Sequence, residues 1–212
     1  MFFKSRARKS VNNLDYMSNL SALISNEVYK PIQQRRQNIQ NYILDRSIES
    51  DIIVVYYNDA NKDVIMGIRG TKTASDLYSD FLLGLQQITN IKAFINSDRF
   101  KNVKNKLENV IDKYDKLGYN IRITGHSLAG FETIKLAQKY NQVDNGVAFN
   151  AGSVPVQLIK DNIPDNVEHF RNPRDIISYG WRNDKQTTEY INKNKLGSYF
   201  NPLKNHTINY FT

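Results

Sequence analysis

The sequence of 212 residues contains no cysteine. This absence excludes disulfide bonds, thiolate metal sites and a cysteine nucleophile. No apolar run is long enough to span a bilayer, and no apolar stretch follows the charged residues of positions 1–9. We therefore expect neither a transmembrane segment nor a secretory signal, and a location in the cytoplasm or in a particle such as a virion. Internal repeats and low-complexity linkers are also lacking, and the length suits one domain over residues 1–212.

Acidic residues are fewer than basic ones. The sequence has 21 Asp and Glu and 29 Lys and Arg, which gives a formal net charge of +8. Such a charge favours anionic partners such as phospholipid headgroups or nucleic acid, although it can also serve solubility alone. Nothing in the sequence resembles a nucleic-acid recognition motif, so we expect no specific nucleic-acid partner. Residues 1–12 predict a flexible basic tail, with contact to a membrane or nucleic acid as the alternative.

Strand patterns alternate with helix patterns along most of the chain. Residues 14–45 and 75–89 have helical patterns, residues 98–117 carry apolar residues on one helical face, and Gly118 ends that helix. Residues 128–140 form a further predicted helix. β-Branched and apolar runs predict strands at 51–57, 64–69, 119–124, 146–150 and 167–170, the first two of them as a hairpin. This alternation predicts an α/β fold with a central, mostly parallel sheet flanked by helices.

One motif lies between a predicted strand and a predicted helix: Gly125-His126-Ser127-Leu128-Ala129-Gly130. A G-x-S-x-G-like turn in this context exposes its serine above the sheet, and glycines permit the close approach of strand and helix. The following helix directs its free N–H groups at the reacting centre. We therefore predict Ser127 as a nucleophile and Gly125 and Gly130 as the elbow glycines; a chance serine at a strand–helix junction is the alternative.

A serine nucleophile requires a base and an acid that orients the base. Only three histidines are present, and His206 alone combines a loop-like setting with a place after the candidate acid. Asp175 is the first carboxylate after the strand at 167–170, where parallel strands place functional loops. Its rivals are Asp161, Asp165 and Asp184, and Asp175 could instead cap a helix or pair with a nearby arginine.

An oxyanion needs two or more N–H donors, and the residue after the nucleophile, Leu128, supplies one. The end of the strand at 64–69 could supply another through Thr71, with a simple turn there as the alternative.

Several segments together resemble the class 3 lipase family of α/β-hydrolases: Ile68-Arg69-Gly70-Thr71, Asp76-Leu77 with Asp80, Thr124-Gly125-His126-Ser127-Leu128, and Asn172-Pro173-Arg174-Asp175. The resemblance covers roughly residues 50–212 and implies a compact α/β-hydrolase fold. It also implies Thr71 and Leu128 as oxyanion donors, Asp175 as acid and His206 as base. Ala129 stands where the family usually has a second glycine, and the short chain leaves fewer substrate loops.

The resemblance implies hydrolysis of carboxylic esters of lipids through an acyl-enzyme, with no cofactor and no metal. The alternatives are a thioesterase or acyltransferase with the same triad, or a degenerate hydrolase that binds lipid or protein. Apolar residues in 73–97 suggest either a lid, as in related lipases, or a helix packed in the core. A lid together with the positive charge favours an anionic membrane surface as the substrate's setting.

Overall fold

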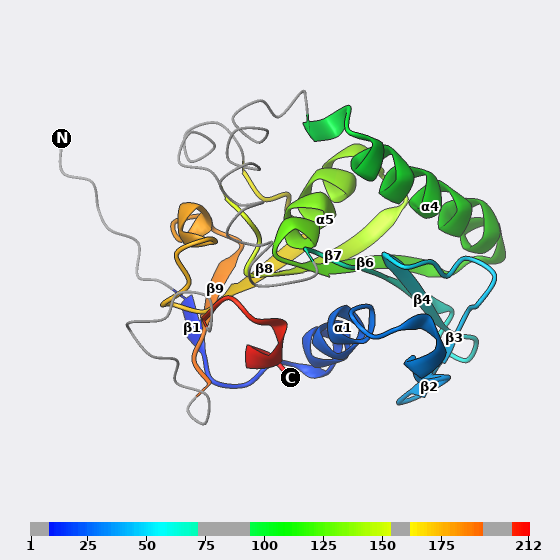
Figure 1. The fold of residues 1–212 in the computed structure, drawn as a ribbon, viewed down its shortest axis with the longest axis horizontal. Coiled ribbons are helices and arrows are strands. Elements are labelled where there is room, and N and C mark those ends of the chain that lie inside the picture. The colour runs from blue at the N-terminus through cyan, green and yellow to red at the C-terminus, as the bar shows by residue number, and fades with distance from the viewer. Residues whose placement is uncertain (1–8, 72–93, 154–161, 193–204) are drawn as a thin grey trace.

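The computed structural model describes residues 9–71, 94–153, 162–192 and 205–212. Within these ranges the strands form one sheet of nine, in the order β1-β9-β8-β7-β6-β5-β4-β3-β2 (Figure 1). Neighbouring strands are parallel from β5 through β9 to β1, and antiparallel from β2 to β5. The strands are β1 Lys9–Val11, β2 Asn38–Ile39, β3 Tyr42–Leu44, β4 Ile53–Asn58, β5 Asp63–Ile68, β6 Asn120–His126, β7 Val143–Phe149, β8 Val167–Arg171 and β9 Thr187–Tyr190.

The central strands are covered on both faces. All six residues of β5 are buried, and so are five of the six in β4. Runs of this kind, rich in β-branched residues, are typical of strands between two layers of helix. Helices α4 (Asp98–Tyr114) and α5 (Leu128–Lys139) cover one face, and α1 (Tyr16–Glu27) covers the other (Figure 1). The predicted α/β architecture with a mostly parallel sheet is therefore confirmed.

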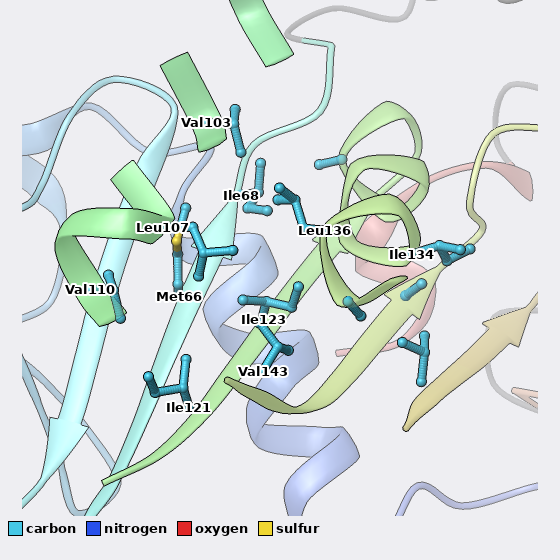
Figure 2. Close-up of a cluster of buried hydrophobic side chains, with 14 of the residues drawn as sticks. Met66, Ile68, Val103, Leu107, Val110, Ile121, Ile123, Ile134, Leu136 and Val143 are labelled. Atoms are coloured by element: carbon cyan, nitrogen blue, oxygen red, sulfur yellow. The ribbon is translucent and has the colours of Figure 1, made fainter. Parts of the chain in front are cut away.

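The larger core lies between the sheet and the pair α4 and α5. Ser97 caps α4 by accepting a hydrogen bond from the Phe100 N–H, and the buried residues of the helix recur every three or four positions. Val103, Leu107 and Val110 pack against Met66 and Ile123 of the central strands (Figure 2). Gly118 ends the last turn with a positive φ of 74°. This packing fixes β6, whose end carries the predicted nucleophile.

The opposite face is covered by α1 and by the C-terminal segment. Leu20 and Ile24 of α1 pack on Val54 and Ile65 of the sheet. Phe211 lies against Phe149 of β7, with ring centroids 5.0 Å apart. The end of the chain is thereby held close to the carboxyl ends of the central strands, which brings the late histidine near the elbow.

Several sequence predictions differ from the structure. In the predicted helical stretch 14–45, the helix ends at Glu27, a short 3₁₀ turn follows at Ile32–Gln34, and residues 38–44 contain the strands β2 and β3. In the predicted tail of 1–12, Lys9–Val11 form β1, because the edge of β9 offers unpaired backbone groups. Residues 1–8 lie outside the described ranges.

The predicted helix 75–89 lies outside the described residues, and so does most of the segment 73–97, for which a lid and a core helix were the alternatives. From that segment, Phe94 is described and packs edge-to-face on Phe100 and Phe131. Among the described residues, no helix is both long enough and apolar enough to cross a membrane.

Candidate active site

Ser127 lies at the sharp turn between β6 and α5. Its φ of 62° and ψ of −124° lie in a region that residues with a Cβ seldom adopt, at a typical cost of about 1–3 kcal/mol. Three backbone hydrogen bonds hold it there. The Ser127 N–H donates to Phe149 O at 3.0 Å, and Ser127 O accepts from the N–H groups of Phe131 and Gly152. The strain is thus imposed by β7 and α5 together.

The elbow glycines are required by close approach. A Cβ on Gly125 would lie 2.5 Å from the carbonyl oxygen of Ala129, a backbone atom that cannot move aside. A Cβ on Gly130 would lie 3.0 Å from Ala151 Cα. Gly125 lets the chain fold back on itself, and this close packing is compatible with alanine at position 129.

Ser127, His206 and Asp175 come together although 79 and 31 residues separate the hydrogen-bonded pairs. The His206 Nε2 lies 2.7 Å from Ser127 Oγ, and His206 Nδ1 lies 2.9 Å from Asp175 Oδ2. The side chains of His206 and Asp175 are at most 1% exposed, and Ser127 is 4% exposed. A histidine placed between a hydroxyl and a carboxylate can accept a proton from one while the other stabilises its charged form.

Asp175 lies in the loop after β8 and accepts two backbone hydrogen bonds besides that of His206. The Ile177 N–H donates to Oδ1 and the Ser178 N–H donates to Oδ2, each at 3.1 Å. Burial by itself would raise the pKa of Asp175, but the neighbouring His206 and these hydrogen bonds outweigh it and lower the pKa. Arg171, which pairs with Glu189, donates to the Asp175 backbone carbonyl. The carboxylate is therefore held ionised and in a fixed orientation.

The loop that carries His206 is fixed by two asparagine side chains. Asn150 and Asn172 each donate an amide N–H to the carbonyl oxygen of Asn205, at 3.2 and 3.0 Å. Asn150 also accepts from the Asn172 backbone N–H at 2.8 Å, so the two amides form one unit. The ends of β7 and β8 thus determine where the histidine lies.

The turn after β5 lies against Ser127. A Cβ on Gly70 would lie 3.4 Å from Ser127 Cβ, so the segment containing Arg69, Gly70 and Thr71 borders the serine. Thr71 is half-buried and is the last residue described before the gap. Leu128 is the first residue of α5, where backbone N–H groups have no acceptor within the helix.

An ion pair ties this turn to α5. Arg99, near the start of α4, donates to the Arg69 carbonyl and to both oxygens of Glu132, the latter at 2.9 Å. Glu132 is completely buried on α5, so burial raises its pKa and Arg99 opposes that rise. One guanidinium group therefore fixes the position of the turn after β5 relative to the helix after Ser127.

Solved structures with a similar fold include lipases. The chain covers 76% of the Lip2 lipase from Yarrowia lipolytica with 81% of its own length, at 20% identity and a TM-score of 0.50. A triacylglycerol lipase from Penicillium expansum matches 86% of this chain over 82% of its own, at 17% identity and a TM-score of 0.51. This chain has the α/β-hydrolase fold. The predicted resemblance to lipases is thus confirmed at the level of the fold.

A third neighbour is a triacylglycerol lipase whose catalytic centre is described as a serine protease triad, with 16% identity, a TM-score of 0.50, and coverage of 76% of this chain and 72% of that one. No protein-family profile matches the sequence, and none of the curated proteins matches it.

The rival acids have other contacts in this α/β-hydrolase fold. Asp165 pairs with Lys185 on the surface, and Asp184 accepts from the backbone N–H groups of Ile163 and Gln186. Asp161 lies outside the described residues. Of the candidates described, Asp175 is the carboxylate in contact with His206.

His126 and Tyr29 also belong to this region, and neither is among the site residues predicted from the sequence. The His126 Nε2 lies 2.6 Å from the His206 carbonyl oxygen. Tyr29, just after α1, contacts both His126 Nδ1 and the Gly70 N–H. The position of His126 beside Ser127 was a usable signal, whereas nothing near Tyr29 in the sequence indicated its place.

The two other histidines make the fold sensitive to acid. Burial lowers the pKa of His126 and of His169 to about 3, against about 6.5 in an unfolded chain. Since the unfolded chain binds these protons first, stability is complete above about pH 6.5 and falls as the pH decreases toward 3. Each histidine is expected to lower the free energy of unfolding by about 2 kcal/mol at about pH 5 relative to neutral pH.

Urea unfolding at several pH values measures this loss. A His169→Gln variant can retain hydrogen bonds to Thr187 and Ala151 and is expected to lose about half of the pH dependence. An identical pH dependence in the variant and the original protein would contradict the assignment.

Proposed function

We propose that this chain is a serine hydrolase that cleaves carboxylic esters of lipids through an acyl-enzyme. The proposal rests on one observation: Ser127 Oγ, the His206 ring and the Asp175 carboxylate form a continuous chain of hydrogen bonds of 2.7 and 2.9 Å. The serine stands on a strained strand-to-helix turn, as nucleophile elbows require. Asp175, Ser127 and His206 are the residues to which we assign catalysis.

The first half-reaction forms the acyl-enzyme. With the His206 Nδ1–H donated to Asp175, Nε2 is free to accept the Ser127 hydroxyl proton. The Oγ then bonds to the ester carbonyl carbon, whose oxygen becomes negative. The proton then passes from Nε2 to the oxygen of the departing alcohol, as the bond between that oxygen and the acyl carbon breaks. His206 is neutral again when the ester has become an acyl-serine.

The second half-reaction uses water in place of the serine. His206 Nε2 takes a proton from water, the resulting hydroxyl attacks the acyl carbon, and the proton returns to Ser127 Oγ as the acid leaves. We assign the Leu128 N–H at the start of α5 and the Thr71 backbone N–H, with its hydroxyl, as donors to the oxyanion in both steps. The N–H of Gly70 is already bonded to Tyr29, which favours Thr71 as the donor from that turn.

Lipid esters are the substrate class that best fits the surface beside the acid. Ile176 and Tyr179, on the loop that begins at Asp175, are 60% and 49% exposed. Arg182 lies 3.8 Å above the Tyr179 ring centroid, which adds positive charge to this apolar edge. With the net charge of +8, these residues favour an anionic lipid surface as the place where substrate is met.

Fluorophosphonate labelling tests the proposal directly. We expect one adduct, on the peptide that contains Ser127, in the folded protein and none after unfolding in urea, because only the assembled triad activates the hydroxyl. Turnover of p-nitrophenyl esters of graded chain length measures ester hydrolysis, and vesicles with and without anionic lipid test the surface preference. Absence of both labelling and turnover would favour a degenerate, lipid-binding protein.

A further inference from the structure

Two side chains outside the triad link the oxyanion turn to the loop of the base. The Gly70 N–H donates to Tyr29 Oη at 3.1 Å, Tyr29 Oη lies 3.2 Å from His126 Nδ1, and His126 Nε2 lies 2.6 Å from the His206 carbonyl oxygen. Tyr29 lies just after α1, Gly70 in the turn after β5, His126 at the end of β6 and His206 in the C-terminal loop. The connection therefore runs across three segments of the proposed site.

The direction of every hydrogen bond in this chain is determined by its ends. The Gly70 N–H can only donate, and the His206 carbonyl can only accept. The His126 Nε2 must therefore carry the proton, its Nδ1 must accept, and the Tyr29 hydroxyl must donate. Burial lowers the pKa of His126 to about 3 and raises that of Tyr29 to about 12, so both groups keep these protons near neutral pH.

The packing around these hydrogen-bonded groups leaves little space for other positions of the Tyr29 and His126 side chains. A Cβ on Gly70 would lie 2.5 Å from the His126 carbonyl oxygen and 2.7 Å from Tyr29 Oη. The Tyr29 and His126 rings meet edge to face at 6.2 Å, and the His126 and His206 rings lie 4.9 Å apart. Any shift of the tyrosine or the histidine would consequently be transmitted to the turn or to the base.

We propose that Tyr29 and His126 are positioning residues that hold the oxyanion turn and the backbone of the catalytic base in one fixed relation to Ser127. This inference rests on the proposed hydrolase function. Asn150 and Asn172 hold the loop at the Asn205 carbonyl, and His126 holds it one residue further on, at the base itself. Neither Tyr29 nor His126 touches the reacting atoms.

Substitution of either residue is expected to lower kcat with little change in KM, because misplacement of the base affects the transition state more than substrate binding. We expect Tyr29→Phe and His126→Leu each to lower kcat about ten- to a hundredfold. The double variant is expected to lose little more than His126→Leu alone, because both substitutions break the same chain.

Rescue separates positioning from general packing. A glutamine at position 126 offers one acceptor and one donor, so His126→Gln is expected to recover most of the kcat that His126→Leu loses. Tyr42→Phe is the matched control, since it removes another buried tyrosine hydroxyl. This hydroxyl donates to Asp63 at a distance of 2.6 Å, and the pair lies away from the site. That variant is expected to keep full kcat.

Two kinetic results would overturn the inference: kcat within twofold of the original in both Tyr29→Phe and His126→Leu, or a His126→Gln variant as slow as His126→Leu. Independently of turnover, ring ¹⁵N spectra of the folded protein are expected to show His126 protonated at Nε2 alone, and protonation at Nδ1 would contradict the chain. If the original protein neither hydrolyses esters nor takes the fluorophosphonate label, the proposed function fails instead, whatever tautomer His126 adopts.

Discussion

Replacement of Ser127 by alanine is expected to lower kcat for p-nitrophenyl ester hydrolysis by about 10⁴-fold or more. The hydroxyl supplies both the atom that bonds to the acyl carbon and the proton that His206 accepts, so no group in the site replaces it. The backbone strain at φ 62° is unchanged, because alanine retains the Cβ. Stopped assays at high enzyme concentration measure the residual rate.

A matched serine variant serves as control. Ser25 on α1 is also buried, and its hydroxyl shares a 2.8 Å hydrogen bond with Thr124 on the strand that leads to the elbow. We expect Ser25→Ala to retain turnover and Ser127→Ala to retain a folded circular dichroism spectrum. A folded Ser127→Ala protein that kept more than about a tenth of the turnover would reject Ser127 as the nucleophile.

The centre of the fold could be predicted from the sequence because its elements are long and strongly patterned. The runs over 51–57 and 64–69 contain enough β-branched residues to identify β4 and β5 and their hairpin. The apolar face over 98–117 repeats through four turns and predicts α4 almost to its ends. Elements of this length can be predicted from their local sequence pattern alone.

The edges of the sheet could not be predicted in the same way. The strands β2 and β3 have two and three residues, too few for an alternation that can be distinguished from helical spacing. The strand β1 forms because β9 lies beside it, and Thr188, the residue that pairs with Lys9, follows 179 positions later in the sequence.

The residues of the candidate site also differ in how far the sequence predicts them. Residue type and chain order selected Ser127, Asp175 and His206, because each chemical role admits few side chains and only three histidines exist. Tyr29 is one of 13 tyrosines, and its contact with His126 spans 97 positions. A positioning role of this kind depends on tertiary packing, which no local pattern records.

Substitution of Asp175 by asparagine is expected to lower kcat by about 10³- to 10⁴-fold with a nearly unchanged KM. An amide has one acceptor oxygen, whereas Asp175 accepts from His206, Ile177 and Ser178 through two. If the amide N–H₂ faces His206, the ring proton moves to Nε2, which can then no longer accept from Ser127. In either orientation the charged form of His206 loses the neighbouring anion.

Asp184→Asn is the matched control, because this rival acid also accepts two backbone N–H bonds in a turn. It is expected to retain full turnover and fluorophosphonate labelling, while Asp175→Asn slows both. Equal losses in the two variants would indicate a structural effect and not a catalytic one. If the three residues act as a unit, adding Asp175→Asn to Ser127→Ala is expected to lower kcat hardly any further. Independent contributions would instead lower kcat by the product of the two single effects.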